Sequence, residues 1–178
     1  AISNADALFN DGYSWTGGNP DGDITIVEFL DYRCGYCRRA HPDINELVTS
    51  DGNIRYIIKE FPILGEESTL ASRFAVAVKH VAGDDTYKLV SDALMNQNSD
   101  VTQASLSELA NTLGLDTDAI FTEMNSEAVT QELQETQLLA QRLQISGTPT
   151  FVFQDEMVRG YAPLDAMRGI VDGVRSDG

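Results

Sequence analysis

Apolar residues run almost without interruption through two short segments near the start of the chain, residues 24–30 and 54–61. Both are rich in β-branched and aromatic residues, which favours strands that are buried on both faces of a sheet. Residues 34–49, between them, show helical spacing, so a parallel pair with a right-handed crossover helix is predicted. Residues 1–23 end in a dense cluster of turn formers and predict an arm and a loop, with no strand.

The period of the pattern changes to 3.6 residues after Leu64 and stays so for about 75 residues, which indicates a block of amphipathic helices. The strand pattern returns at residues 147–153, and Met157 and Val158 predict the second strand of a hairpin. A last apolar stripe that begins near Pro163 predicts a C-terminal helix.

This order of elements is typical of a small α/β unit that is interrupted by an all-helical insertion. We expect residues 1–64 and 139–178 to form the α/β unit and residues 65–138 to form the insertion. A chain of 178 residues can bury one sizeable core, so disulfide staples are not needed.

Composition narrows the function classes. The chain has 28 Asp and Glu residues against 12 Lys and Arg residues, a formal net charge of −16. Such an excess argues against a large phosphate-binding surface, so we expect no nucleic-acid partner. No run of 18 apolar residues and no N-terminal signal pattern is present, which predicts a soluble chain that is either mature or trimmed.

The two cysteines of the chain, Cys34 and Cys37, stand where the first predicted strand meets the predicted helix. Unpaired N–H groups and the positive dipole end of a helix N-terminus stabilise a thiolate there. Cys37 lies one turn further on, within disulfide reach and more shielded. We interpret the pair as a redox-active dithiol in which Cys34 attacks and Cys37 resolves. The alternatives are an inert disulfide or a zinc half-site, to which His41 and His80 would add ligands.

The dithiol Cys34-Gly-Tyr-Cys37, with Pro42 five residues later and Thr148-Pro149 before the returning strand, resembles the pattern of thioredoxin-fold proteins. The segments at residues 18–29 and 60–65 and the helical insertion resemble, more narrowly, the DsbA family of extracytoplasmic thiol oxidoreductases, in its Com1-like and copper-sensitivity suppressor-like branch. The resemblance implies a thioredoxin fold, which is a central mixed β-sheet flanked by helices, with an all-helical insertion.

The resemblance also implies roles for residues outside the dithiol. Pro149 would follow a cis peptide bond, lie opposite the dithiol and leave the backbone of Thr148 open to a substrate strand. Glu28, six residues before Cys34, would be the acidic residue beneath the active site. Gly35 and Tyr36, between the cysteines, would tune the redox poise, and Tyr36 would contact substrate if it is exposed.

Glu28 is the anomaly in its apolar strand, because a buried carboxylate must be paired, protonated or next to water. Proton transfer to and from Cys37 would explain its position. The alternatives are a solvated position on the strand or a structural pairing with Lys59 in the neighbouring strand.

Three arginines flank the dithiol in sequence: Arg33, Arg38 and Arg39. They would favour the thiolate, or they would lie on the surface with their stems against the protein. His41 is seven residues past Cys34 on the same helix and out of its reach, so we expect a half-buried helix residue. We expect His80 to pack among its apolar neighbours in the insertion.

These features predict a protein disulfide oxidoreductase, in the first place a DsbA-like thiol oxidase of the periplasm from which a signal peptide has been removed. Its partners would be unfolded or reduced proteins and a membrane redox partner that resets the dithiol. We expect no metal, and no cofactor beyond the Cys34–Cys37 disulfide. Gly35-Tyr36 and Thr148 keep a DsbC-like isomerase or reductase open. A non-redox metal-handling or binding module and a cytosolic glutathione-dependent isomerase are further alternatives.

Overall fold

The two apolar segments form neighbouring parallel strands, β2 (Ile24–Leu30) and β3 (Ile54–Glu60), in a computed structural model that describes residues 3–177. The returning segment adds β4 (Thr150–Phe153) antiparallel to β2, and β5 (Glu156–Arg159) antiparallel to β4. The parallel pair and the hairpin are therefore confirmed. The sheet order is β1-β3-β2-β4-β5.

The first strand of the sheet, β1 (Trp15–Gly18), was not predicted. The expectation of an arm and a loop is wrong here, because β1 pairs antiparallel with β3 at the edge of the sheet. Its two glycines are typical of a loop, yet the strand needs both. A Cβ atom at Gly17 would lie 2.2 Å from the Trp15 ring, and Gly18 has a φ of +67°. Packing requires the residues that made this segment look like a loop.

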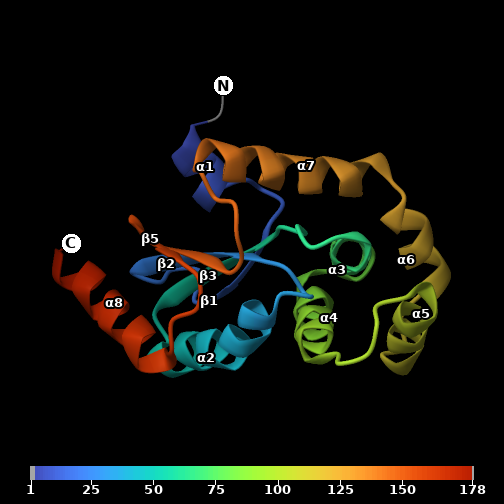
Figure 1. Ribbon diagram of the computed structural model, residues 1–178, viewed down its shortest axis with the longest axis horizontal. Helices are drawn as coiled ribbons and strands as arrows, with labels where there is room; N and C mark the ends of the chain where they lie inside the picture. Colours follow the sequence, from blue (N-terminus) through green and yellow to red (C-terminus); the bar gives the residue numbers. More distant parts are fainter. Residues whose placement is uncertain (1–2, 178) are drawn as a thin grey trace.

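Helices cover both faces of the sheet (Figure 1). One face carries α2 (Gly35–Asp51) and α8 (Leu164–Asp177), and the other carries α1 (Asn4–Phe9) and α7 (Glu127–Arg142). Side chains alternate between these two layers along β2, so Ile26 and Leu30 belong to one buried cluster while Val27 and Phe29 belong to the other. Glu28 therefore points toward the layer that contains α2.

The remaining helices lie together beside the sheet (Figure 1): α3 (Glu66–Ala82), α4 (Asp84–Asn96), α5 (Gln103–Thr112) and α6 (Thr117–Met124). The helical block and the C-terminal helix are confirmed. One buried cluster joins the two parts, since it contains Tyr56 of β3 together with Phe74 and Tyr87 of the block. The division at residues 65–138 stays a prediction.

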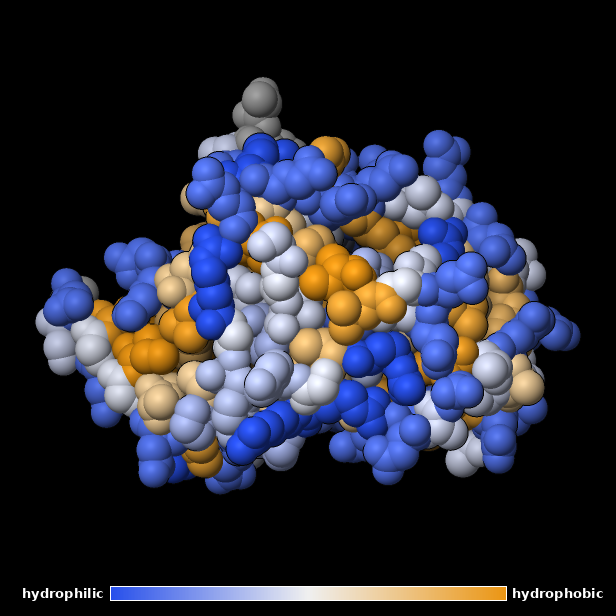
Figure 2. Space-filling model, in the orientation of Figure 1, coloured by the Kyte–Doolittle hydropathy of each residue, from blue (hydrophilic) through white to orange (hydrophobic). Residues whose placement is uncertain are grey.

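The surface is mostly polar. Figure 2 shows hydrophilic residues over much of the viewed face, with hydrophobic surface gathered near its centre below α7 and again near α8. Tyr36, Ile63 and Leu64 are among the large apolar side chains that remain exposed. None of the helices within residues 3–177 combines the length and the hydropathy that a membrane span requires.

Candidate active site

The dithiol lies at the N-terminus of α2. Cys34 is the N-cap residue in extended backbone geometry, and its Sγ accepts a hydrogen bond from the backbone N–H of Cys37 at 3.3 Å. Both thiols are free, and Cys37 is fully buried whereas Cys34 is 7% exposed. One sulfur is thus placed at the surface end of the helix and the other beneath it.

Hydrogen bonds stabilise the ionised form of Cys34. A bond from the Cys37 thiol is the largest effect; burial opposes it, and bonds from Thr148 and from the backbone N–H groups of Cys37 and Tyr36 add to it. Together they lower the pKa of Cys34 to about 6. A large fraction of this thiol is therefore ionised at neutral pH, which is the nucleophilic state.

Cys37 has the opposite surroundings. Burial, the hydrogen bond to Cys34 and the negative charge of Glu28 all raise the pKa of the Cys37 thiol far above its ordinary value. Cys37 holds its proton in the reduced state, so any reaction that makes or consumes its thiolate must move a proton in a place that solvent does not reach.

The loop before β4 closes the site from the other side. The Thr148–Pro149 peptide bond is cis, and the Thr148 carbonyl accepts a hydrogen bond from the Cys34 thiol at 3.2 Å. Residues that are 114 positions apart in the sequence therefore meet at the reactive sulfur. Between the cysteines, nothing lies within 4 Å of a Cβ placed on Gly35, and Tyr36 is 62% exposed at the mouth of the site.

Glu28 is completely buried in β2 below the dithiol. Its Oε1 accepts a hydrogen bond from the Tyr56 hydroxyl, and its Oε2 has no partner among the described residues. Burial raises the pKa of Glu28, while the Tyr56 hydrogen bond and the charges of His41 and Lys88 act to lower it. The negative charge of Glu28 in turn contributes to the raised pKa of the buried Cys37 thiol.

The alternative that paired Glu28 with Lys59 is wrong. Glu28 is in register with Ile58, so Lys59 points to the opposite face of the sheet, where its ammonium group pairs with Asp11. Tyr56, two residues before Ile58 on the same face, takes the place expected for Lys59.

The three arginines hold neighbouring segments. Arg33 donates to the Ser99 carbonyl at 3.2 Å and Arg38 to the Tyr32 carbonyl at 3.3 Å, while the Arg39 guanidinium lies 5.0 Å from the centre of the Tyr161 ring. The main causes of the lowered pKa of Cys34 are the hydrogen bonds described above, which outweigh its burial, and not these charges.

Neither histidine lies as expected. His41 is 4% exposed rather than half-buried, and its Nε2 lies 2.8 Å from Asp92 Oδ1 on α4. His80 does not pack among apolar neighbours, because its two ring nitrogens contact Glu123 on α6 and Glu132 on α7. Each of these contacts joins segments that are far apart in the sequence, and the periodicity of apolar residues cannot reveal such contacts.

Asp31 is a structural residue of the site that the sequence analysis did not single out. Its buried carboxylate accepts hydrogen bonds from the backbone N–H groups of Ile63 at 2.8 Å and Leu64 at 3.2 Å, and from the Ser68 hydroxyl at 2.8 Å. It thereby fixes the exposed apolar loop after β3 beside the dithiol. A lone aspartate at the end of an apolar strand was the available signal.

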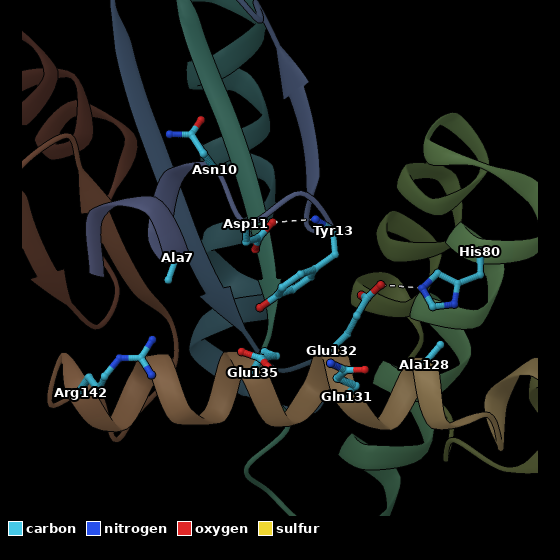
Figure 3. Close-up of a pocket in the computed structure, with 10 residues that line it drawn as sticks. All are labelled: Ala7, Asn10, Asp11, Tyr13, His80, Ala128, Gln131, Glu132, Glu135 and Arg142. Atoms are coloured by element: carbon cyan, nitrogen blue, oxygen red, sulfur yellow. Dashed lines mark hydrogen bonds and ion pairs between the residues drawn. The ribbon is translucent and has the colours of Figure 1, made fainter. Parts of the chain in front are cut away.

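A separate hollow of about 390 Å³ lies between the N-terminal segment and α7 (Figure 3). Asp11, Tyr13, Glu132 and Glu135 form part of its wall, and it is on the sheet face opposite α2, away from the thiols. Within residues 3–177, no group of three or more His, Cys, Asp and Glu side chains could hold a metal ion.

Comparisons with solved structures agree with this geometry. The thioredoxin-like oxidoreductase from Silicibacter pomeroyi DSS-3 is 38% identical, with 98% of this chain and 99% of that chain covered at a TM-score of 0.90. The thiol-disulfide exchange protein alpha-DsbA2 from Wolbachia pipientis is 28% identical, with 96% and 91% covered at 0.86. A periplasmic thioredoxin-like protein from Salmonella enterica serovar Typhimurium is 26% identical, with 97% of each chain covered at 0.84.

Among curated sequences, the chain also matches Na(+)/H(+) antiporters; it spans 24% of the length of the Salinispora arenicola protein, at 27% identity over 155 residues. Residues 25–172 match the family described as the DSBA-like thioredoxin domain. The chain therefore belongs to this family, and the match spans the Cys34–Cys37 pair.

Proposed function

We propose that this domain is a thiol oxidase that passes its Cys34–Cys37 disulfide to reduced or unfolded proteins. The observation that carries the proposal is the unequal setting of the two sulfurs, with a stabilised thiolate at Cys34 and a buried, protonated thiol at Cys37. A reduced state that is stabilised in this way makes the disulfide a better oxidant.

The reaction would proceed in two exchanges. A substrate thiolate attacks Cys34 Sγ, the Cys34–Cys37 bond breaks, and Cys37 leaves and takes a proton that Glu28 supplies. A second substrate thiolate then attacks the substrate sulfur of the mixed disulfide, so Cys34 leaves as a thiolate and the substrate disulfide forms. Two electrons pass from the substrate to the domain.

The surroundings of the dithiol suit an extended peptide as substrate. The exposed Tyr36, the apolar loop with Ile63 and Leu64, and the backbone of Thr148 lie around the reactive sulfur. Apolar surface of this kind favours unfolded chains over compact ones. The reduced domain would then pass its electrons to a membrane redox partner. The Salmonella relative described as periplasmic supports a periplasmic location for this chain.

An isomerase or reductase direction is the second candidate. Gly35-Tyr36 between the cysteines and Thr148 before the cis proline support it, and so does the pKa of Cys34. That pKa, about 6, falls between the value near 3.5 of DsbA and the value near 7 of thioredoxin.

The equilibrium of the domain with a glutathione redox buffer distinguishes the oxidase from a reductase. We expect a reduction potential above about −200 mV, on the oxidising side of the glutaredoxins. A potential near the −270 mV or so of thioredoxin would assign a reductase instead. Cys34→Ala serves as the control, because it removes the dithiol and should show no exchange at all.

A further inference from the structure

Every turnover of the proposed reaction moves a proton to or from Cys37. Glu28, whose negative charge acts on the Cys37 thiol, points from β2 toward the layer in which Cys37 is buried. Glu28 has no exposed surface, so it must itself exchange protons with something that reaches solvent.

Two buried side-chain atoms lack a hydrogen-bond partner within residues 3–177, and they are Glu28 Oε2 and His41 Nδ1. One is a carboxyl oxygen and the other an imidazole nitrogen, so either can hold a proton that the other gives up. His41 lies one helical turn after Cys37 on α2, and its charge acts on Glu28. Both unpartnered atoms therefore belong to residues that are buried where α2 packs on β2, below the dithiol.

The other side of His41 reaches the surface. Its Nε2 contacts Asp92, whose side chain is 36% exposed, and Asp92 accepts a hydrogen bond from Lys88 at 2.6 Å. Asp92, Lys88 and Tyr56 all line a hollow of about 600 Å³ in the surface between α2, α4 and β1. The same hollow thus touches the partner of His41 and the partner of Glu28.

We propose that His41, held by Asp92, carries protons between Glu28 and the solvent in this hollow. His41 is a positioning residue, since it acts on the dithiol through Glu28 and touches neither thiol nor substrate. When Cys37 leaves as a thiolate it takes the proton of Glu28; the Glu28 carboxylate then takes a proton from His41, which is reprotonated from solvent through Asp92. In the resetting direction each proton moves the opposite way, and no electron passes through His41.

Asn45 on its own helix and Asp92 on α4 contact His41 Nε2, and Lys88 bonds to Asp92. Toward the sheet, the charge of His41 acts on Glu28, which bonds to Tyr56. Histidine is the side chain best suited to gain and lose a proton near neutral pH, and none of these other five groups has that property. A purely structural role for His41 would satisfy both ring nitrogens, whereas here the buried one has no partner.

The test follows a single turnover of the oxidised domain with excess dithiothreitol, at several pH values and at low and high imidazole concentration at constant ionic strength. The variant His41→Gln keeps a polar side chain of similar size but cannot relay a proton. We expect its rate to fall about tenfold in dilute buffer, a modest part of the range for acid–base catalysis. Imidazole, which is small enough for the hollow, should restore much of the rate and should leave the unaltered protein unaffected.

His80→Gln is the matched control, since it removes the other histidine of the chain, which lies between α3, α6 and α7, and it should change neither the rate nor the pH profile. Asp92→Asn should change the pH profile of the rate in the same direction as His41→Gln. If His41→Gln does not fold, Asp92→Asn tests the relay in its place. A His41→Gln rate equal to that of the unaltered protein, or a loss with an unchanged pH profile and no imidazole response, overturns the inference.

The inference rests on the proposed exchange chemistry, and the two fail differently. If the unaltered protein does not exchange disulfides with dithiothreitol, the proposed function fails. If it does exchange them, and His41→Gln behaves like the control His80→Gln, only the relay fails.

Discussion

The two sulfurs of the dithiol are chemically identical and differ only in what surrounds them. Cys34 receives hydrogen bonds at a helix end, which lower its pKa to about 6, whereas Cys37 is enclosed below it near a carboxylate. The thiolate is the nucleophile in disulfide exchange, so we expect Cys34 to be the sulfur that meets the substrate.

Replacing Cys37 with alanine should trap substrates. The Cys34 thiolate would still attack a disulfide of an oxidised protein, which is the reverse of the proposed exchange, and form a mixed disulfide. Cys37 would not be in place to resolve it. We expect Cys37→Ala to accumulate covalent adducts that are visible on non-reducing gels and identifiable by mass spectrometry. Cys34→Ala should accumulate none. Adducts on the Cys34→Ala variant instead would reverse the assigned roles.

Replacing Glu28 with glutamine should slow exchange without weakening the fold. Loss of an acid–base group costs roughly 10²-fold or more in rate. Burial raises the pKa of Glu28, so this group's contribution to folding is lost as pH rises above the pKa of an unfolded glutamate, and glutamine removes that loss. We therefore expect slower single-turnover exchange at pH 7 and equal or greater resistance to guanidinium at pH 8.

Glu60→Gln is the control for this prediction, because Glu60 is also buried but bonds to Tyr32, Tyr87 and Ser72 rather than acting on Cys37. If both variants exchange at the same rate as the unaltered protein, Glu28 is a structural residue.

At the scale of elements, Glu60 joins the sheet to the helical block. It lies at the end of β3 and accepts hydrogen bonds from the hydroxyls of Tyr32 at 2.6 Å, Ser72 on α3 at 2.7 Å, and Tyr87 on α4. Hydroxyl donors carry no positive charge, and burial raises the pKa of Glu60 to about 7. The junction between the two parts is therefore sensitive to pH.

This junction predicts a pH-dependent stability that Glu60→Gln should remove. Between the ordinary pKa of 4.5 and about 7, the folded state keeps a proton that the unfolded state has released, so the free energy of unfolding falls as pH rises through this interval. The loss is on the order of 3 kcal/mol at about 1.4 kcal/mol per pKa unit. Guanidinium unfolding at pH 5 and pH 8 should show a smaller loss for the variant, and an identical pH dependence would contradict the prediction.

Elements with strong periodicity could be predicted from the sequence, and elements formed by close packing could not. β2, α2 and β3 each have a long apolar pattern, and the dithiol stands at a recognisable strand-to-helix junction. β1 has four residues, two of them glycine, and exists because Gly17 and Gly18 allow the Trp15 ring and β3 to approach closely. No local pattern contains that information.

The hydrogen-bond partners of buried polar residues could not be predicted from the sequence either. Whether Glu28 meets Tyr56 or Lys59 depends on the register of two strands, because a shift by one residue exchanges the two faces. The contact of His41 with Asp92 depends on how α2 packs against α4, because the two residues are 51 positions apart in the sequence. The position of the two thiols at a strand-to-helix junction could be predicted, but not these contacts between buried polar side chains.

At the scale of the whole molecule, scarce cations hold the N-terminal segment in place. The chain has 12 Lys and Arg residues, and its formal net charge is −16. Four of these cations contact residues 4–13: Arg55 at Phe9, Lys59 at Ala7 and Asp11, Lys79 at Tyr13, and Arg142 at Asn4. Lys59 is the one of these four that meets a carboxylate in the segment, at Asp11, while the other three donate to carbonyl or amide oxygens.

The Lys59–Asp11 pair is the most buried of these contacts, with the Lys59 side chain fully enclosed and that of Asp11 8% exposed. Asp11→Asn would leave the buried ammonium group with neutral acceptors alone, among them the Ala7 carbonyl at 3.0 Å and the Ser14 hydroxyl at 3.2 Å. Removing one partner of a buried pair costs about 3 kcal/mol or more. We expect that loss in the free energy of unfolding at pH 7, measured with guanidinium.

Asp165→Asn is the matched control. The Asp165 side chain is fully exposed, so this substitution should change the free energy of unfolding by less than about 0.5 kcal/mol. The double variant Asp11→Asn/Lys59→Met should lose less than the two single variants together, because it removes both charges. Lys59 holds the pKa of Asp11 below its ordinary value, so the stabilisation is present above about pH 4 and is lost as pH falls through the lowered pKa. If Asp11→Asn costs no more than Asp165→Asn at pH 7, the N-terminal segment is not held by this charge pair.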